Sequence, residues 1–142
     1  MRFLVMVKAT PQSEAGELPS AEMLTKMGAF NQELVKAGIM LGGEGLAPSS
    51  AGARISYAGG KPTVTDGPFT ETKELVAGFW ILQGKSKEEI VAWLSRCPFE
   101  RGEEVEIRRI YEMEDFAPVM TPEIKAQEES LSRQLQNEAR QK

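Results

Sequence analysis

Apolar and polar positions follow two different spacings along this chain, and the spacings predict strands and helices. Between Arg2 and Lys8 the residues Phe-Leu-Val-Met-Val are all apolar, which is typical of a strand buried on both faces. A second strand of this kind is predicted from Leu75 to Gln83. The segment Glu103–Ile110 instead alternates, with Val105 and Ile107 on one face and charged residues on the other, which predicts an edge strand.

Two helices are predicted between these strands. After a polar loop over residues 10–20, apolar residues recur at helical spacing and Ser20 is a suitable N-cap, so we expect a helix over Ala21–Ala37. A capping box of Ser86 and Glu89 opens the second helix, which is expected to end before Pro98.

The remaining strands complete the fold prediction. A glycine-rich strand is expected over Ile39–Leu46, and a hairpin over Ala53–Ala58 and Lys61–Thr65 around the turn Gly59-Gly60. The order is then β-α-β, hairpin, β-α-β. This order predicts an α+β fold of the ferredoxin-like split βαβ kind with an inserted β-hairpin.

The two double-sided strands predict a homodimer. Two helices cover only one face of the sheet, so a second apolar face, carrying Val76, Trp80 and Leu82 or the residues that alternate with them, needs another cover. Packing of two sheets around a two-fold axis is the simplest arrangement that supplies it.

A tail follows the predicted domain, for which we expect the range 1–116, with 117–142 as the tail. Thr121-Pro122-Glu123 has a cap and a proline at the first helical position, which predicts a helix that continues to Gln141. Its apolar stripe is thin. The helix is therefore either a frayed tail or an arm that docks on a partner subunit.

Composition excludes several classes of function. The 142 residues carry a net charge of -4 with no basic stripe, so nucleic acid is not an expected partner. The longest apolar stretch, Leu75–Leu82, is too short to span a membrane, and the N-terminal segment predicts a strand rather than a signal peptide, so a cytoplasmic location is expected. The chain has no histidine and one cysteine, Cys97, and no phosphate-binding glycine motif. We therefore expect no metal and no cofactor.

The segment Lys61–Glu74, KPTVTDGPFTETKE, resembles the signature of the DGPF group within the YCII-related protein family. The segments Gly42–Pro48 and Val105–Ile110 are similar to the family's upstream segment and closing strand. The resemblance implies a ferredoxin-like dimer whose sheets face each other as an α+β barrel. It also implies a candidate enzyme in which a histidine and an aspartate lie in a cleft. This chain has no histidine, so only the aspartate has a counterpart, Asp66.

Asp66 is the candidate catalytic residue. Strand alternation places it on the same hairpin face as Ile55 and Val64, so we expect its carboxyl group in an apolar cleft, where it is suited to acid–base chemistry. The alternative is structural, because an aspartate before Gly67-Pro68 commonly accepts backbone hydrogen bonds in a turn.

Four further residues are candidates for binding a substrate. Glu44 lies in the glycine-rich strand, where a ligand can approach closely, and would form a pair of carboxylates with Asp66. Phe69 is either a cleft wall or a core residue. Glu71 and Lys73 either pair with Asp66 or hold an anion, or they are solvated.

Two functions remain open at this point. The first is a cofactor-independent lyase or isomerase that transfers a proton on a small organic molecule with Asp66. The alternative is a non-catalytic module that binds a small molecule or has a regulatory role, which the resemblance links to extracytoplasmic-function sigma factors. In a third interpretation the DGPF segment only stabilises the fold and has no other function. Cys97 is expected to be a packing residue. Arg54 is expected to face solvent.

Overall fold

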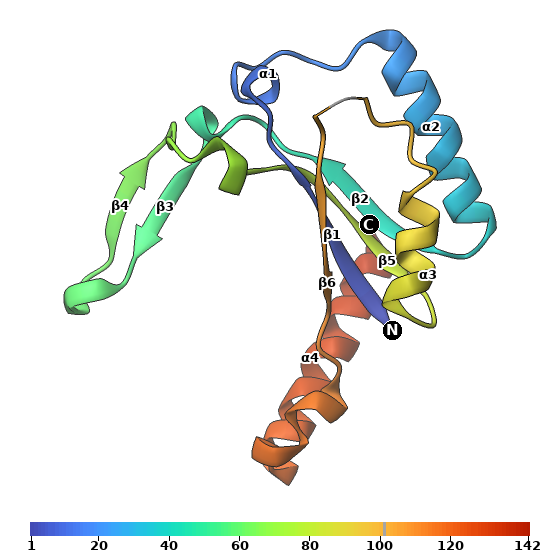
Figure 1. Ribbon diagram of the computed structural model, residues 1–142. Helices are drawn as coiled ribbons and strands as arrows, with labels where there is room; N and C mark the ends of the chain where they lie inside the picture. Colours follow the sequence, from blue (N-terminus) through green and yellow to red (C-terminus); the bar gives the residue numbers. More distant parts are fainter. Residues whose placement is uncertain (101) are drawn as a thin grey trace. The chain divides into compact units, whose positions relative to one another are not determined.

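The computed structural model of the protein describes residues 1–100 and 102–142, without the side chain of Lys73, and shows a mixed α+β architecture (Figure 1). The chain forms two compact units, Met1–Ile110 and Tyr111–Lys142.

The first unit is built on a four-stranded antiparallel sheet in the order β2-β5-β1-β6. Its strands are β1 (Arg2–Lys8), β2 (Met40–Gly45), β5 (Val76–Gln83) and β6 (Val105–Arg109). The two strands with continuous apolar runs, β1 and β5, are central, and β6 lies at an edge. This is the strand order that the split βαβ pattern predicts. The sheet of the single chain stays open and does not close into a barrel.

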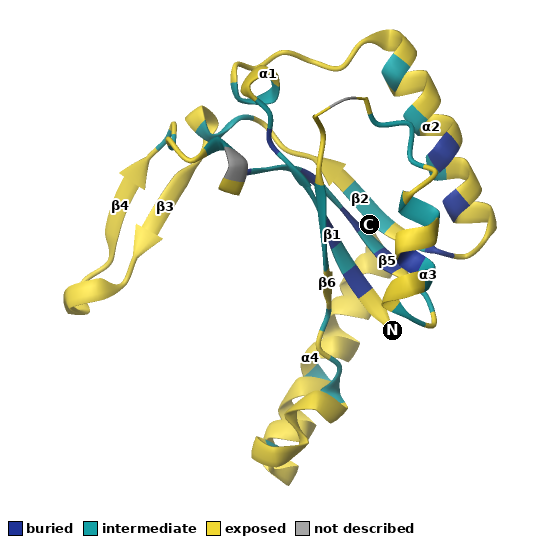
Figure 2. Ribbon diagram, viewed as in Figure 1, coloured by how far each residue is buried: buried dark blue, intermediate teal, exposed yellow. Residues whose placement is uncertain are grey.

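Helices α2 (Ala21–Lys36) and α3 (Lys87–Leu94) lie on one face of the sheet (Figure 1). Ser20 caps α2 by accepting a hydrogen bond from the amide of Met23 at 3.1 Å, and Ser86 caps α3 in the same way. The predicted cap at Ser20 is confirmed. Of the predicted capping box at α3 only the Ser86 half is confirmed, because the Glu89 carboxylate accepts the amide of Lys85 at 2.6 Å rather than that of Ser86. The buried core between helices and sheet consists of Phe3, Val5, Phe30, Leu34, Ile39, Trp80, Leu82 and Ile90, drawn among the dark blue residues of Figure 2.

Strand alternation decides which apolar residues face the helices. Trp80 pairs with Val5 and is buried, and its indole N–H donates to the side-chain oxygen of Asn31 at 3.0 Å. Trp80 and Leu82 therefore belong to the helix-covered core. The second apolar face is carried by the residues that alternate with them. We call this second face the uncovered sheet face because neither α2 nor α3 packs on it; its apolar residues are Leu4, Met6, Phe79 and Ile81, all of them half-buried.

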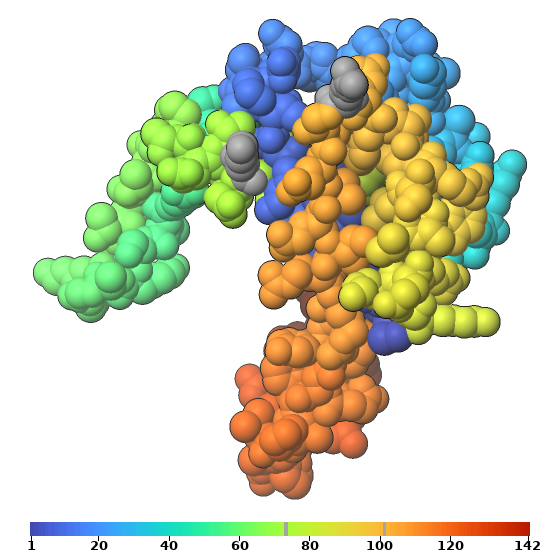
Figure 3. Space-filling view, viewed as in Figure 1, coloured from blue at the N-terminus to red at the C-terminus, as the bar shows by residue number. Residues whose placement is uncertain are grey.

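The predicted hairpin is present as a separate two-stranded sheet of β3 (Ala53–Ser56) and β4 (Thr63–Asp66). Gly59 and Gly60 form the turn with φ angles of 78° and 86°, which side chains other than glycine rarely tolerate. All eight strand residues are exposed, and Figure 3 shows the hairpin as a narrow green ribbon of side chains.

Short helices connect these elements. Helix α1 (Pro11–Glu14) corrects the prediction of a purely polar loop over residues 10–20, because Thr10 and Ser13 form a capping box there. Three 3-10 helices follow, η1 (Ser49–Ala51), η2 (Ala58–Gly60) and η3 (Thr72–Glu74).

The second unit contains η4 (Met113–Val119) and the long helix α4 (Pro122–Gln141). Thr121 accepts a hydrogen bond from the amide of Ile124 at 3.2 Å, so the predicted cap and helix are confirmed. Docking of this helix on a partner stays a prediction. Of the helices that the structure describes, none has the length and apolar character needed to cross a membrane.

Candidate functional site

Asp66 ends β4 and lies opposite Ala53 at the root of the hairpin. The pairing of Ile55 with Val64 confirms that Asp66 shares its face of the ribbon with apolar side chains. That face and Asp66 itself are exposed, so the expected burial of the carboxyl group is not found within the single chain. The reason is that the hairpin forms its own sheet, and no third strand or helix of the described chain pairs with it.

The residue after Asp66 must be glycine because the backbone of η1 lies directly against it. A Cβ atom on Gly67 would stand 2.6 Å from the carbonyl carbon of Ser49 and closer still to the oxygen. The amide of Gly67 donates to the carbonyl oxygen of Gly52 at 3.0 Å, and the Gly67–Pro68 peptide bond is cis. Gly67 therefore has a structural role, which is to let the two backbone segments approach each other closely.

Ser49 joins the DGPF segment to helix α1. Its hydroxyl donates to a carboxylate oxygen of Glu14 at 2.6 Å and accepts the amide N–H of Phe69 at 3.0 Å. The amide of Ser49 donates to the other oxygen of Glu14 at 3.1 Å. Both side chains are half-buried, where each lost hydrogen bond is costly. We call this set of contacts among Glu14, Ser49 and Phe69 the root network.

The sequence analysis missed Glu14 and Ser49. The two residues are 35 positions apart, and neither belongs to an apolar pattern. The one signal in the sequence was local. The pair Thr10 and Ser13 has the spacing of a capping box, and recognition of that box would have placed Glu14 on a helix.

Arg54 of β3 contacts Phe69 of the DGPF segment. The guanidinium carbon of Arg54 lies 3.8 Å from the centroid of the Phe69 ring, a cation–π contact. Phe69 is half-buried and Arg54 is exposed. The prediction that Arg54 faces solvent is confirmed, and the structure adds a contact of its guanidinium with the aromatic ring. By strand alternation it lies on the ribbon face opposite Asp66.

Among the described side chains, neither Glu44 nor Glu71 has a hydrogen bond or ion pair with Asp66. Glu44 is exposed on β2 opposite Phe79. Glu71 is exposed just before η3. The predicted role of Lys73 falls on a side chain outside the described residues. Within the described part of the chain no three metal-binding side chains come together.

Cys97 is a packing residue in the structure. Its sulfur lies 3.9 Å from that of Met27, beside the core, and burial raises the pKa of its thiol to about 11. The thiol is therefore protonated at neutral pH and is a poor nucleophile.

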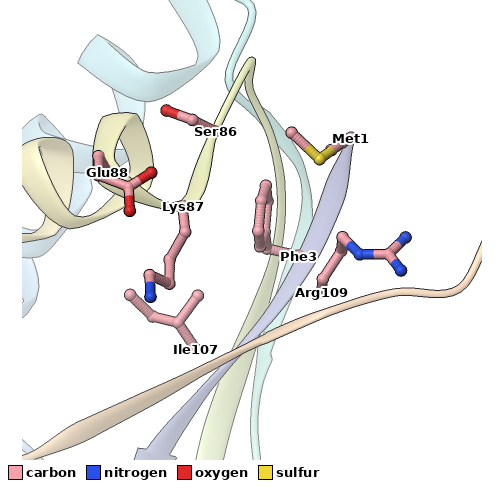
Figure 4. Close-up of a pocket in the computed structure, with 7 residues that line it drawn as sticks. All are labelled: Met1, Phe3, Ser86, Lys87, Glu88, Ile107 and Arg109. Atoms are coloured by element: carbon pink, nitrogen blue, oxygen red, sulfur yellow. The ribbon is translucent and has the colours of Figure 1, made fainter.

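A shallow hollow of about 390 Å³ lies at the other end of the sheet (Figure 4). It is lined by Met1, Phe3, Ser86, Lys87, Glu88, Ile107 and Arg109. Strand β1 leads away from this hollow over about 20 Å, and the amide of the residue after it, Ala9, donates to the carbonyl oxygen of Leu75, which follows the DGPF segment. The hollow and the end of the DGPF segment therefore lie at opposite ends of β1. Figure 4 shows Lys87 and Arg109 extending in different directions from either side of Phe3, so their charges do not converge.

Comparison with known proteins decides the family. The sequence profile of the YCII-related domain matches residues 1–114, which includes every strand described above. The chain belongs to the YCII-related domain family. The match ends before α4 begins, so the long helix lies outside the family domain. Placement of this YCII-related protein in the DGPF group still rests on the Lys61–Glu74 segment and remains a prediction.

Two individual proteins are similar to this YCII-related chain. An uncharacterized protein, R00369, of Rhizobium meliloti (strain 1021) is 33% identical over 67 residues, which cover 47% of this chain and 54% of that protein. The alignment thus spans about half the length of the curated relative. One similar solved structure is that of 5-chloro-2-hydroxyhydroquinone dehydrochlorinase from Burkholderia phenoliruptrix AC1100, in complex with 2,5-dihydroxybenzoquinone. It has a TM-score of 0.40 and 17% identity, and the match covers 80% of this chain and 98% of that one. Similarity at this level transfers neither a substrate nor a reaction.

Proposed function

We propose that this YCII-related protein is a cofactor-independent enzyme that transfers a proton on a small organic molecule, in a lyase or isomerase reaction. Asp66 is the acid or base. The observation that carries the proposal is the position of Asp66: its carboxylate ends an apolar ribbon face, and the backbone that follows is fixed by Gly67 and the root network. A carboxylate held on a fixed backbone is suited to repeated proton transfer with one geometry.

The proposal includes a homodimer in which two sheets pack face to face as an α+β barrel. Its support is the uncovered sheet face, whose apolar residues from β1 and β5 lie side by side in the register Leu4–Ile81 and Met6–Phe79. Burial of such a face in a two-fold interface stabilises the assembly by the hydrophobic effect. A second chain near the hairpin root would also exclude water from Asp66, which strengthens electrostatic interactions there.

The test is a proton-exchange experiment, which detects proton transfer without an identified product. A panel of small carbonyl compounds with acidic C–H groups is incubated with the protein in D2O, and deuterium incorporation is followed by NMR. The Asp66→Asn variant keeps the shape of the side chain but cannot transfer the proton, so exchange should slow by about 10²–10⁴-fold. Glu17→Gln removes an exposed carboxylate that is not among the candidate site residues and serves as the control, with exchange unchanged. Equal exchange rates for Asp66→Asn and the wild type would refute the role of Asp66.

A second function is favoured by the exposure of Asp66 in the single chain. The protein is then a non-catalytic module that binds a small molecule at the hairpin root or has a regulatory role. In this case Asp66→Asn weakens binding of a ligand in a direct titration, and no compound of the panel exchanges faster with protein than without it. The link to extracytoplasmic-function sigma factors rests on the resemblance of the DGPF segment alone.

A further inference from the structure

Strand β6 is an open edge of the four-stranded sheet. It pairs with β1 on one side, and no strand of the described chain pairs with its other side. The register of β6 against β1 runs from Val105 to Arg109 without a shift. The opposite edge strand, β2, differs, because its register is interrupted between Met40 and Gly42. An irregularity of this kind protects an edge against further pairing, so β6 is the edge that is suited to receive another strand.

The hydrogen bonds to β1 determine which backbone groups of β6 are free. The amide of Lys8 donates to the carbonyl oxygen of Glu104, which is the next residue opposite it in the register, at 2.9 Å. In an antiparallel pair such bonded positions recur at every second residue. The backbone groups of Val105 and Ile107 therefore point away from β1, and within the described chain no other group bonds to them.

The side chains of β6 carry an order of charges that is complementary to itself. Glu106 and Arg108 lie on the uncovered sheet face, opposite Met6 and Leu4. A second β6 that runs antiparallel and is centred on Ile107 places Glu106 of each copy directly opposite Arg108 of the other. Centring on Glu106 or on Arg108 instead brings like charges together, which is unfavourable. The register with unlike charges is also the one in which the free backbone groups of Ile107 meet.

The contacts within one chain are compatible with this pairing. The carboxylate of Glu106 lies 3.5 Å from the Nζ of Lys8 and 3.6 Å from the guanidinium of Arg108. The Arg108 side chain is 72% exposed, so its fork of N–H donors is accessible to a second carboxylate. Lys8 is only 15% exposed and stays beside the Glu106 of its own chain. In the pair, each Glu106 then has cations from both copies around it and faces no other carboxylate.

We propose that β6 pairs with β6 of a second copy of this chain as an antiparallel strand centred on Ile107. This inference rests on the proposed function, because it names the edge along which the two sheets of that homodimer meet. The two-fold axis passes between the two Ile107 residues, and the uncovered sheet faces of both copies lie on the same side of the joined sheet. Curling of the joined sheet turns these faces inward, as the proposed α+β barrel requires.

The test uses two charge reversals that each prevent the pairing alone and restore it together. Arg108→Glu places a carboxylate opposite Glu106 of the second copy, and Glu106→Arg places a guanidinium opposite Arg108. Dimer dissociation constants are measured by sedimentation on the full-length proteins. Each variant alone should show a dissociation constant raised by roughly tenfold or more, because the two-fold axis repeats the repulsive contact. An equimolar mixture of the two variants should recover the wild-type affinity, since every contact then joins unlike charges.

Lys36→Glu is the control for net charge. It changes the charge of the chain by the same amount as Arg108→Glu, and Lys36 is exposed at the end of α2, away from β6 in the sequence. Its dissociation constant should equal that of the wild type.

A second measurement needs no substitution. Backbone hydrogen exchange of the wild type is followed residue by residue by NMR, below and above the dissociation constant. The amides of Val105 and Ile107 should become protected as the concentration rises, because the second copy bonds to them. The amides of Glu106 and Arg108 point to β1 and should be protected at every concentration.

The outcomes separate this inference from the proposed function. If both variants dimerise as the wild type does, and exchange at Val105 and Ile107 is independent of concentration, the strand pairing is overturned and the face-to-face dimer stands. If each variant weakens the dimer but their mixture does not restore it, the register centred on Ile107 is overturned. A wild type that stays monomeric at all concentrations overturns both the pairing and the proposed dimer.

Discussion

Gly67→Ala is the sharpest test of how the DGPF segment is held in place. The substitution adds one methyl group at a residue whose φ angle is not positive, so alanine can adopt the backbone conformation itself. Any loss of folding stability therefore comes from the atoms that the new Cβ contacts. This Cβ meets the backbone of η1, with the carbonyl carbon of Ser49 at 2.6 Å and its oxygen nearer.

The cost follows from how little this neighbour can move. The carbonyl oxygen of Ser49 accepts the amide of Gly52 at 3.0 Å, and the amide of Ser49 donates to Glu14. Relief of the overlap must shift η1 and stretch these bonds. Overpacking against rigid structure costs about 1–3 kcal/mol, and each weakened hydrogen bond adds about 1 kcal/mol, so we expect a loss of about 3 kcal/mol. A loss of this size lowers Tm by roughly 10 °C.

The assay is urea denaturation followed by circular dichroism, together with a thermal scan. Gly28→Ala is the matched control, because Gly28 is exposed in α2 and a Cβ there meets nothing within 4 Å. Alanine is favoured over glycine in a helix, so the control should gain about 0.5–1 kcal/mol. If Gly67→Ala unfolds at the same urea concentration as the wild type, the described contact between Gly67 and Ser49 is wrong.

Two further predictions concern Ser49 and Cys97. Ser49→Ala leaves the amide of Phe69 without its acceptor and removes one of the two donors to the Glu14 carboxylate, which keeps the backbone amide of residue 49. The free energy of unfolding should therefore fall by about 1–3 kcal/mol in the same urea assay, and an unchanged midpoint would contradict the root network. Cys97 should react slowly with a thiol reagent at pH 8, because its pKa is raised from 9.0 to about 11 by burial, and stoichiometric labelling of the folded protein within seconds would contradict this. Since the folded state favours the protonated thiol, this contribution to stability is complete below pH 9 and is lost as the pH rises through 11, and Cys97→Ala should remove that alkaline loss.

The hydrophobic pattern was sufficient to predict the sheet order. Strands β1 and β5 are apolar at successive positions, and only central strands are buried on both faces, so their pairing in the middle of the sheet follows from composition. The pattern does not say which face of such a strand meets the helices, because Phe79 and Trp80 are both aromatic. That choice depends on partners elsewhere in the chain. Gly43 leaves room for the indole of Trp80, and Asn31 accepts its N–H.

The candidate site was predictable only in part. The ribbon face of Asp66 follows from the two-residue period of a strand, and the register confirms it. Its exposure does not follow from that period, since alternation gives the direction of a side chain and not what covers it. The root network was hidden for another reason. It joins Glu14 to Ser49 by hydrogen bonds between residues far apart in the chain, and such bonds leave no periodic trace in a sequence.

The root network also constrains how relatives of this protein can diverge. A half-buried acceptor that loses its donor lowers the stability of the folded state more than an apolar group at the same position would. Replacement of both partners by apolar groups can leave the stability nearly unchanged. A change at position 14 alone or at position 49 alone is therefore harmful, and the harm is relieved when the second position changes too. Across homologous sequences these two sites should thus be replaced together, as a correlated pair, although 35 positions separate them.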